Sequence, residues 1–157
     1  MAKTFHMTSG MRIATTILTA LLSAGLPFGP LTLLSVRGRK SGRIYTIPVA
    51  LVERDGIRWL VAAFGVVSWV CNLRAAGGAQ LMRGRHTEAI GVVELEVAEA
   101  APILKQFLGS FQMVPFIPPY FDVTPRSPLV DFEREATQHP VFRIERSEQD
   151  AGKEEAP

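Results

Sequence analysis

The order of apolar and polar positions predicts one amphipathic helix followed by a series of short strands. Between residues 12 and 24, apolar side chains recur at helical spacing opposite a face of hydroxyl residues. Two prolines and two glycines within residues 25–30 end this helix, because proline has no N–H to donate and glycine favours turns. A helix over 12–24 is about 20 Å long, which is too short to cross a bilayer.

After residue 30, short apolar runs alternate with turn-forming residues. The turns fall at residues 37–43, at Asp55-Gly56 and at residues 84–86. The predicted strands cover residues 31–36, 44–52, 57–64, 79–83, 88–97 and 141–145. Strands coupled so closely are typical of a mainly antiparallel barrel, here of about six strands, with helices at its openings.

Three further helices are predicted between these strands, over residues 68–76, 102–110 and 127–138. Ser68 and Ser127 stand at expected N-caps, Pro128 at the first helical turn, and Gly77 at a C-terminus. The segment 113–125 is rich in proline and aromatic residues, so we expect an ordered loop that walls or covers a site. We therefore divide the chain into an N-terminal helix and linker (1–30), a barrel domain (31–146) and a flexible acidic tail (147–157).

Charge is distributed unevenly along the chain, although the net charge is only +2. Residues 1–52 hold six Lys or Arg and no acidic residue. A cationic surface of this kind attracts phosphate, carboxylate or lipid headgroups. Cys71 is the single cysteine, which excludes a disulfide framework and favours a cytoplasmic protein. We expect the N-terminal helix to pack on its own domain, with peripheral membrane docking and a cleavable signal as alternatives.

The strongest local motif is Arg37-Gly38-Arg39-Lys40-Ser41-Gly42-Arg43. Its glycines allow backbone N–H groups to turn inward, and four cations flank one hydroxyl, which together form an anion site suited to phosphate. The motif is not a P-loop, because GxxxxGK[ST] is absent and a strand follows. The alternative is a solubilising hairpin tip.

A second motif combines a strand ending in Ala62-Ala63-Phe64-Gly65 with the segment that contains Trp69 and Asn72. Small residues allow a planar ligand to approach. Trp69 and Asn72 are three residues apart and face the same side of a helix, where they could stack on a ring and bond to it. The alternative is that Trp69 is a core residue and Asn72 is a satisfied polar group.

Taken together in this order, the motifs resemble the deazaflavin-dependent nitroreductases, a branch of the flavin/deazaflavin oxidoreductases with a split β-barrel. The resemblance covers roughly residues 31–97, through the GRKSG turn, Pro48, the Arg-Asp-Gly turn, Ala-Ala-x-Gly and Trp-x-x-Asn-Leu-Arg-Ala. Two departures are Ile44-Tyr45, where the family commonly has Pro-Arg, and a shorter loop between Gly65 and Trp69.

The resemblance implies that coenzyme F420 is the cofactor and that hydride passes from its reduced form to a nitro, enone or quinone-like small molecule. Arg39, Lys40, Ser41 and Gly42 would hold the phosphate and acidic tail. The residues implied around the deazaflavin ring are Tyr45, Thr46, Ile47, Pro48, Val49, Ala63, Phe64, Gly65, Ser68, Trp69 and Asn72.

Hydride transfer requires binding and orientation of the coenzyme rather than a protein nucleophile, and the sequence indicates no catalytic residue. The three histidines are scattered without metal-ligand spacing. Tyr120 is the candidate substrate-side group, as a proton donor or an aromatic wall. The alternatives are FMN as the cofactor, or a non-enzymatic barrel that binds a fatty acid or other lipid at a membrane surface. Nucleic-acid binding is not expected, because aromatic residues do not interleave with the basic turn.

Overall fold

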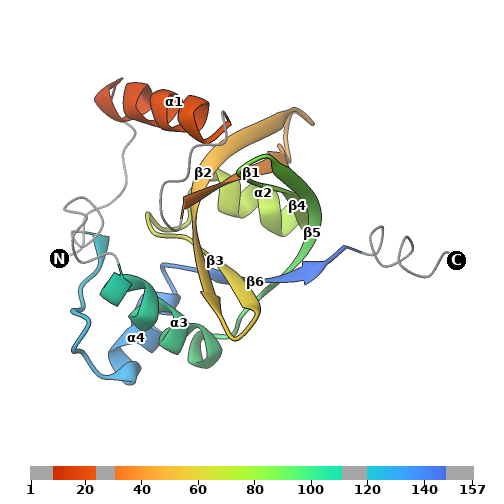
Figure 1. The fold of residues 1–157 in the computed structure, drawn as a ribbon. Coiled ribbons are helices and arrows are strands. Elements are labelled where there is room, and N and C mark those ends of the chain that lie inside the picture. Colours follow the sequence, from red (N-terminus) through yellow and green to blue (C-terminus); the bar gives the residue numbers. More distant parts are fainter. Residues whose placement is uncertain (1–8, 24–30, 111–119, 148–157) are drawn as a thin grey trace, which may run out of the picture.

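The computed structural model describes residues 9–23, 31–110 and 120–147. Its six strands form a closed barrel in the order β1-β2-β3-β6-β5-β4, and every neighbouring pair is antiparallel (Figure 1). This confirms the predicted fold class. The strands are β1 (Leu31–Arg37), β2 (Ile44–Arg54), β3 (Ile57–Val61), β4 (Gly78–Arg83), β5 (His86–Glu94) and β6 (Val141–Arg146).

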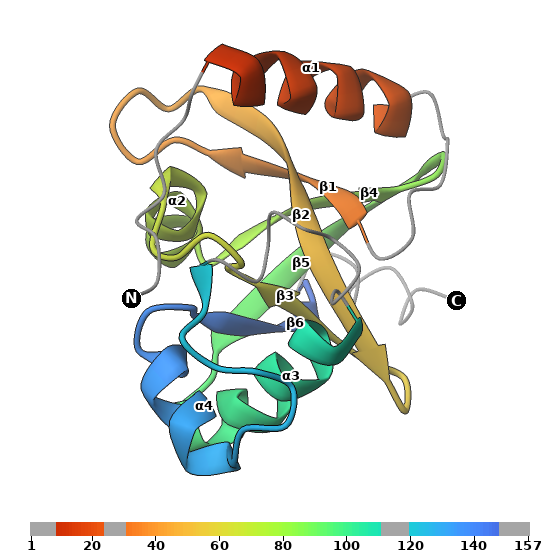
Figure 2. The same cartoon turned by 90° about the vertical axis from the view of Figure 1, so that its left-hand side faces the viewer.

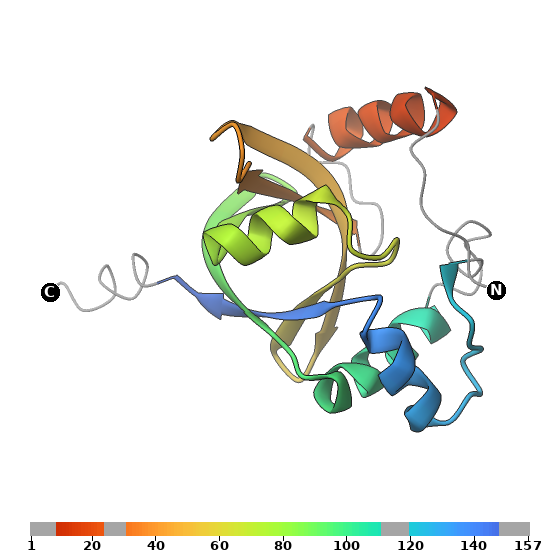
Figure 3. The same cartoon turned by 180° about the vertical axis from the view of Figure 1, so that it is seen from behind.

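Within the described residues, four helices surround the barrel, namely α1 (Ser9–Ser23), α2 (Ser68–Ala76), α3 (Val97–Ser110) and α4 (Leu129–Ala136). Seen from behind, α2 lies across one opening of the barrel (Figure 3). Figure 2 shows α1 lying along β2 at one side, and α3 and α4 packed together at the opposite side. Only α2 therefore covers an opening, while α3 and α4 pack against the outside of the wall.

Two hydrophobic cores lie on opposite faces of the barrel wall. The interior core is closed by Val70 and Leu73 of α2. The outer core joins α3 and α4 to the outward faces of β2 and β3, through Phe107 and Phe132 among others. Residues 49–52 of β2 are buried on both faces, because Val49 and Leu51 belong to the interior core while Ala50 and Val52 belong to the outer one.

Several element boundaries differ from the predicted ones. β3 ends at Val61 rather than Phe64. The Ala62 N–H still donates to the carbonyl oxygen of Pro140 at 3.0 Å, in register with the Val61–Val141 pair, but proline has no N–H to return the bond and the ladder stops there. α3 begins at Val97 rather than Pro102. The first turn of α3 is closed by a bond from the Ala100 N–H to the Glu96 carbonyl. Pro102 lies inside the helix, after this turn, and because proline has no N–H the helix lacks one hydrogen bond there.

The predicted serine caps are wrong. Val67 and Pro128 occupy the N-cap positions of α2 and α4, and neither helix has a side-chain cap bond. The Ser127 hydroxyl instead accepts a bond from the Thr124 N–H at 3.0 Å. The glycine C-cap is confirmed, since Gly77 is left-handed with φ 72° and donates to the Leu73 carbonyl.

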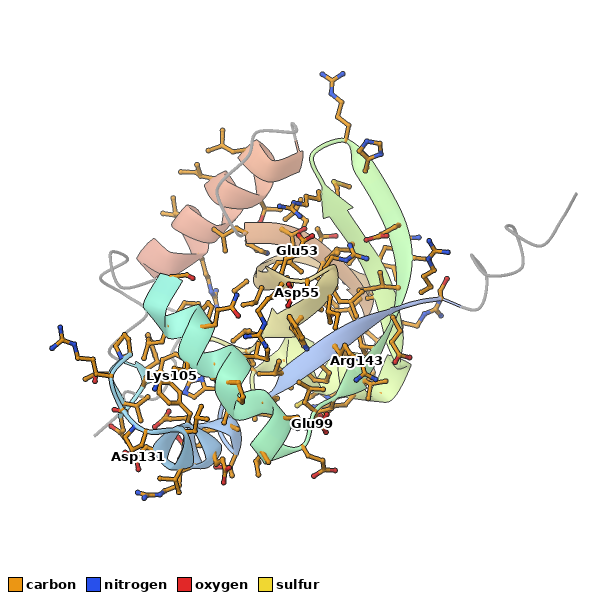
Figure 4. All side chains as sticks on the ribbon, turned by 60° about the horizontal axis from the view of Figure 1, so that its bottom comes forward. Glu53, Asp55, Glu99, Lys105, Asp131 and Arg143 are labelled. Atoms are coloured by element: carbon orange, nitrogen blue, oxygen red, sulfur yellow. The ribbon has the colours of Figure 1, made fainter. Side chains whose placement is uncertain are left out.

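Ion pairs near the β2–β3 hairpin join strands that are not neighbours in the barrel. Glu53 of β2, labelled in Figure 4, pairs with Arg83 of β4 at 3.2 Å, and Arg58 of β3 pairs with Glu88 of β5. The hairpin turn is the predicted one, with Asp55 and Gly56 both left-handed, as a tight two-residue hairpin requires.

α1 begins at Ser9, three residues before its predicted start. Two of the apolar side chains predicted to pack, Ile13 and Ile17, are exposed, whereas Leu21 is half-buried. No helix in the parts that the structure describes has both the length and the apolar character needed to span a bilayer. Docking of α1 on a membrane surface was one of the alternatives, and no finding supports it.

Candidate functional site

The basic turn, residues 37–43, connects β1 to β2. The Gly38 N–H donates to the Arg43 carbonyl at 2.7 Å, and the Gly42 N–H donates to the Gly38 carbonyl at 3.0 Å. Gly42 is left-handed with φ 72°, a conformation that glycine adopts without steric cost. The Ser41 hydroxyl accepts a bond from the Arg43 N–H at 3.2 Å. The turn is therefore a closed, internally bonded loop.

Tyr45 covers one side of this turn. A Cβ placed on Gly38 would lie 2.6 Å from Cε2 of Tyr45, so glycine is required there for the ring to rest on the backbone. The Tyr45 hydroxyl lies 3.2 Å from the Ser41 hydroxyl. Tyr45 nevertheless keeps 46% of its surface exposed, so it is available to a ligand placed beside the turn.

Asn72 attaches the turn to α2. Its side chain is buried, and its Oδ1 accepts bonds from both the backbone N–H of Arg39 at 3.2 Å and Nη1 of Arg39 at 2.7 Å. Nη1 of Arg39 is also 3.4 Å from the Ser68 carbonyl. The predicted role of Asn72 was a bond to a ring ligand. The structure shows its oxygen bonded to Arg39, so that Asn72 orients the turn, and the bond to a ring ligand stays a prediction.

The cations of the turn have no carboxylate partners within the described residues. Arg37, Arg39, Lys40 and Arg43 are all exposed, and none of them is among the ion pairs found there. The arginines outside the turn that take part in ion pairs are Arg58, Arg74, Arg83, Arg134 and Arg143. The pKa of Arg74, for example, is raised by its hydrogen bonds to Glu94.

The first half of β2 continues from the turn as an open strip. Tyr45 and Thr46 are exposed, Ile47 and Pro48 are half-buried, and Val49 is buried in the interior core. The strip also carries Ile44, of which 60% is exposed. The hydroxyl of Thr46 is 2.7 Å from that of Ser35 on β1. Of the predicted ring-binding residues of β2, all but Val49 are exposed or partly exposed.

The segment between β3 and α2, which carries the second motif, lies at the same end of the barrel as the basic turn. Gly65 is left-handed with φ 94°. Phe64 makes an edge-to-face contact with Tyr120, with ring centroids 5.0 Å apart, whereas Ala63 is buried in the outer core. Trp69 is half-buried and packs on the interior core, with its ring 6.2 Å from that of Phe142. Trp69 is thus mainly a core residue.

Several of the predicted site residues therefore form three contacting groups. Arg39, Ser68 and Asn72 are joined directly by hydrogen bonds, as are Ser41 and Tyr45. Phe64 and Tyr120 form a separate contact at the end of β3. Sequence reasoning missed the buried pair Glu135 and His139, which lies beside this contact. Its only sequence signal is an acid four residues before a histidine.

No cluster of three or more potential metal ligands occurs within the described residues. Comparison with curated proteins found no match. Comparison with solved structures shows the fold. An F420-H2 dependent reductase (FDR-A) is 23% identical with a TM-score of 0.53, over 74% of this chain and 94% of that one.

Two other solved structures share the fold. One, described as a domain-swapped dimer, is 24% identical with a TM-score of 0.54, over 83% of this chain and 92% of the other. A protein of unknown function from Agrobacterium tumefaciens is 13% identical with a TM-score of 0.52, over 92% of this chain and 59% of the other.

The family model of the F420H(2)-dependent quinone reductases matches residues 11–110. The matched region contains the basic turn, the open strip of β2, the segment after β3 and α2. It also extends the predicted resemblance over α1 and α3. The chain belongs to the F420H(2)-dependent quinone reductase family and is a deazaflavin-dependent oxidoreductase with coenzyme F420 as its cofactor.

Proposed function

We propose that the basic turn binds the anionic tail of reduced F420, that the open strip of β2 and residues 63–65 flank its ring, and that the acceptor is a quinone-like small molecule. Nitro and enone compounds are acceptors of the same electrophilic class. The observation that carries the proposal is the set of four exposed cations, without acidic partners in the described residues, on a turn that Asn72 holds against α2.

The residues present fit this coenzyme. A phosphate and carboxylates require cations and hydrogen-bond donors, which Arg39, Lys40 and the Ser41 hydroxyl supply. A flat ring requires an open surface with few charges, and the strip from Ile44 to Pro48 exposes apolar and hydroxyl side chains. One guanidinium nitrogen of Arg39 is already bonded to Asn72, which leaves its other nitrogen atoms available to an anion.

Bound F420 supplies a hydride in a single two-electron step. The residues of this chain would then contribute binding and orientation. The Asn72–Arg39 bonds place the cations before a ligand arrives, so that less conformational entropy is lost on binding. Trp69, held by the interior core, closes the opening of the barrel beneath the site. Tyr120, set edge-on to Phe64, is suited to be an aromatic wall on the substrate side.

Fluorescence titration of the purified protein with F420 tests the cofactor assignment, with FMN as the control ligand. We expect saturable quenching by F420 that weakens as salt is added, and weaker binding of FMN. Absence of saturable quenching would overturn the proposed site. Oxidation of reduced F420 in the presence of a soluble naphthoquinone tests the acceptor class, which would be wrong if the coenzyme binds but the quinone is not reduced.

A further inference from the structure

The one buried histidine of the described residues, His139, lies between three segments that meet behind the candidate site. It follows α4, and only 3% of its surface is exposed. Its Nδ1 is 2.9 Å from the carbonyl oxygen of Ala62, at the end of β3. Its Nε2 is 2.9 Å from the carbonyl oxygen of Tyr120. Its ring stacks on Phe121 with centroids 4.0 Å apart.

The contacts of the two ring nitrogens favour a positively charged, doubly protonated ring. A carbonyl oxygen can only accept a hydrogen bond, and a neutral imidazole has a single N–H to donate. With carbonyl oxygens at both nitrogens, only the doubly protonated ring donates both bonds. A neutral ring would leave a nitrogen lone pair facing a carbonyl oxygen, and an unsatisfied buried pair of this kind is costly.

A buried carboxylate supplies the matching negative charge. Oε2 of Glu135 lies 3.5 Å from Nε2 of His139, within ion-pair distance, and accepts no hydrogen bond in the described residues. Oε1 of Glu135 accepts a bond from the Asp122 N–H at 3.1 Å. Glu135 is itself 7% exposed. Buried charges persist when they are paired and hydrogen-bonded. Glu135 is paired with the His139 ring through Oε2 and hydrogen-bonded through Oε1.

The same short segment holds the end of β3 at further points. The Pro140 carbonyl accepts a bond from the Ala62 N–H at 3.0 Å. The Gln138 carbonyl lies so close to Gly65 that a Cβ there would be 3.4 Å away. His139 thus binds the backbone on both sides of the Phe64–Tyr120 contact, since Ala62 precedes Phe64 by two residues and the carbonyl belongs to Tyr120 itself.

We propose that His139 is a positioning residue of this oxidoreductase. As an imidazolium neutralised by Glu135, it joins the end of β3 to the Tyr120 backbone and so fixes the Phe64–Tyr120 pair at the substrate side of the site. Only the link between this role and catalysis rests on the proposed function. The charge of the ring and its hold on the two segments are properties of the protein without any ligand.

Nitrogen NMR of the histidine ring measures the charge directly. In the wild-type protein at pH 7 we expect both ring nitrogens of His139 to show the shift of a protonated nitrogen. A single unprotonated nitrogen would overturn the proposal. In the Glu135→Gln variant, which keeps the shape and the acceptor for Asp122, we expect one of the two protons to be lost. A ring that remains doubly protonated would show that Glu135 is not its counter-charge.

Proton NMR tests the positioning role in the absence of coenzyme. We expect the ring-to-ring Overhauser effect between Phe64 and Tyr120 to be present in the wild type and lost in His139→Gln. Phe132→Leu is the matched control, because Phe132 lies in the outer core and on α4, whereas the hydrogen bonds, ion pair and ring contact of His139 found in the described residues go to Ala62, Tyr120, Glu135 and Phe121. If the control loses the effect as well, or His139→Gln keeps it, the proposed role is wrong.

Steady-state kinetics and coenzyme titration connect the contact to catalysis. In His139→Gln we expect the acceptor KM to rise about tenfold, while the dissociation constant of F420 changes less than threefold, because the basic turn is intact. Phe132→Leu should leave both constants within twofold of the wild type. Equal changes in both variants would indicate a general structural effect. Failure of the wild type to bind F420 would overturn the proposed function, whereas the NMR results would still decide the role of His139.

Discussion

Two regions of the molecule, at α2 and at α3–α4, are stabilised by different interactions. At α2, the basic turn exposes four cations and is attached through the hydrogen bonds of one buried asparagine. In the α3–α4 layer, the two helices bury large apolar side chains against the barrel wall. Cations held close together repel one another, so the turn is not optimised for stability. The contrast indicates that the region at α2 is suited to bind an anion, whereas the α3–α4 layer stabilises the fold.

Strand β2 shows the same contrast within one element. Its residues 49–52 are buried between the two cores, whereas its N-terminal half leaves Ile44 60% exposed. A strand that needed only to close the barrel would gain by covering these apolar positions. The exposed half therefore marks the part of the strand that is available for ligand contact.

The largest expected effect is on stability and comes from the α3–α4 layer. Leu104→Ala removes a fully buried side chain of α3 from the outer core. We expect the free energy of unfolding to fall by about 2–5 kcal/mol, measured by urea denaturation. Binding of F420 to the folded protein should stay within twofold of the wild type. A large loss of affinity would show that the two regions are coupled, contrary to the comparison.

The next effect is on binding and comes from the turn. Replacing both Arg39 and Lys40 by Ala removes two charge-assisted contacts, each worth about 1.5–3 kcal/mol, so we expect F420 affinity to fall at least 100-fold. The salt dependence of binding should flatten, because fewer charges are involved. Arg85→Ala, in the exposed turn between β4 and β5, is the control. Unchanged affinity in the double variant would refute the anion site.

A smaller effect on both properties is expected from Asn72→Ala. The two donors of Arg39 lose their shared acceptor, so we expect a stability loss of about 1–2 kcal/mol and an F420 affinity about tenfold lower. Because all four cations remain, the salt dependence of binding should resemble that of the wild type. Salt dependence that falls as far as in the double variant would mean that Asn72 does more than orient the turn.

The smallest effect is expected at the ion pair between α2 and β5. Arg74 donates to Glu94 at 2.7 and 3.0 Å, and both side chains are about two-fifths exposed. Solvent screening limits such a pair to about 0–1 kcal/mol. Arg74→Gln should therefore change the unfolding free energy by less than about 1 kcal/mol, with a smaller change at high salt. A larger loss would show that the position of α2 depends on this pair.

The strands and turns were largely predictable, because their signals are local. The Asp55-Gly56 turn, the β1–β2 turn and the Gly77 helix end follow from backbone preferences of single residues, and the structure confirms all three. The end of β3 and the start of α3 were not predictable in this way. Both depend on partners from other segments: Ala62 bonds to Pro140, and the Leu95 N–H just before α3 bonds to the Val141 carbonyl.

The candidate site also has one part that was predictable from the sequence and one part that was not. The sequence by itself determined that four cations, two glycines and a hydroxyl share one turn, since these residues are neighbours in the chain. Only the tertiary structure decided that Asn72 supports Arg39 across 33 positions, that Trp69 packs on the interior core, and that Glu135 and His139 hold the end of β3. The reason is physical: a hydrogen bond between distant segments depends on where the fold places its donor and acceptor, which no local pattern of side chains encodes.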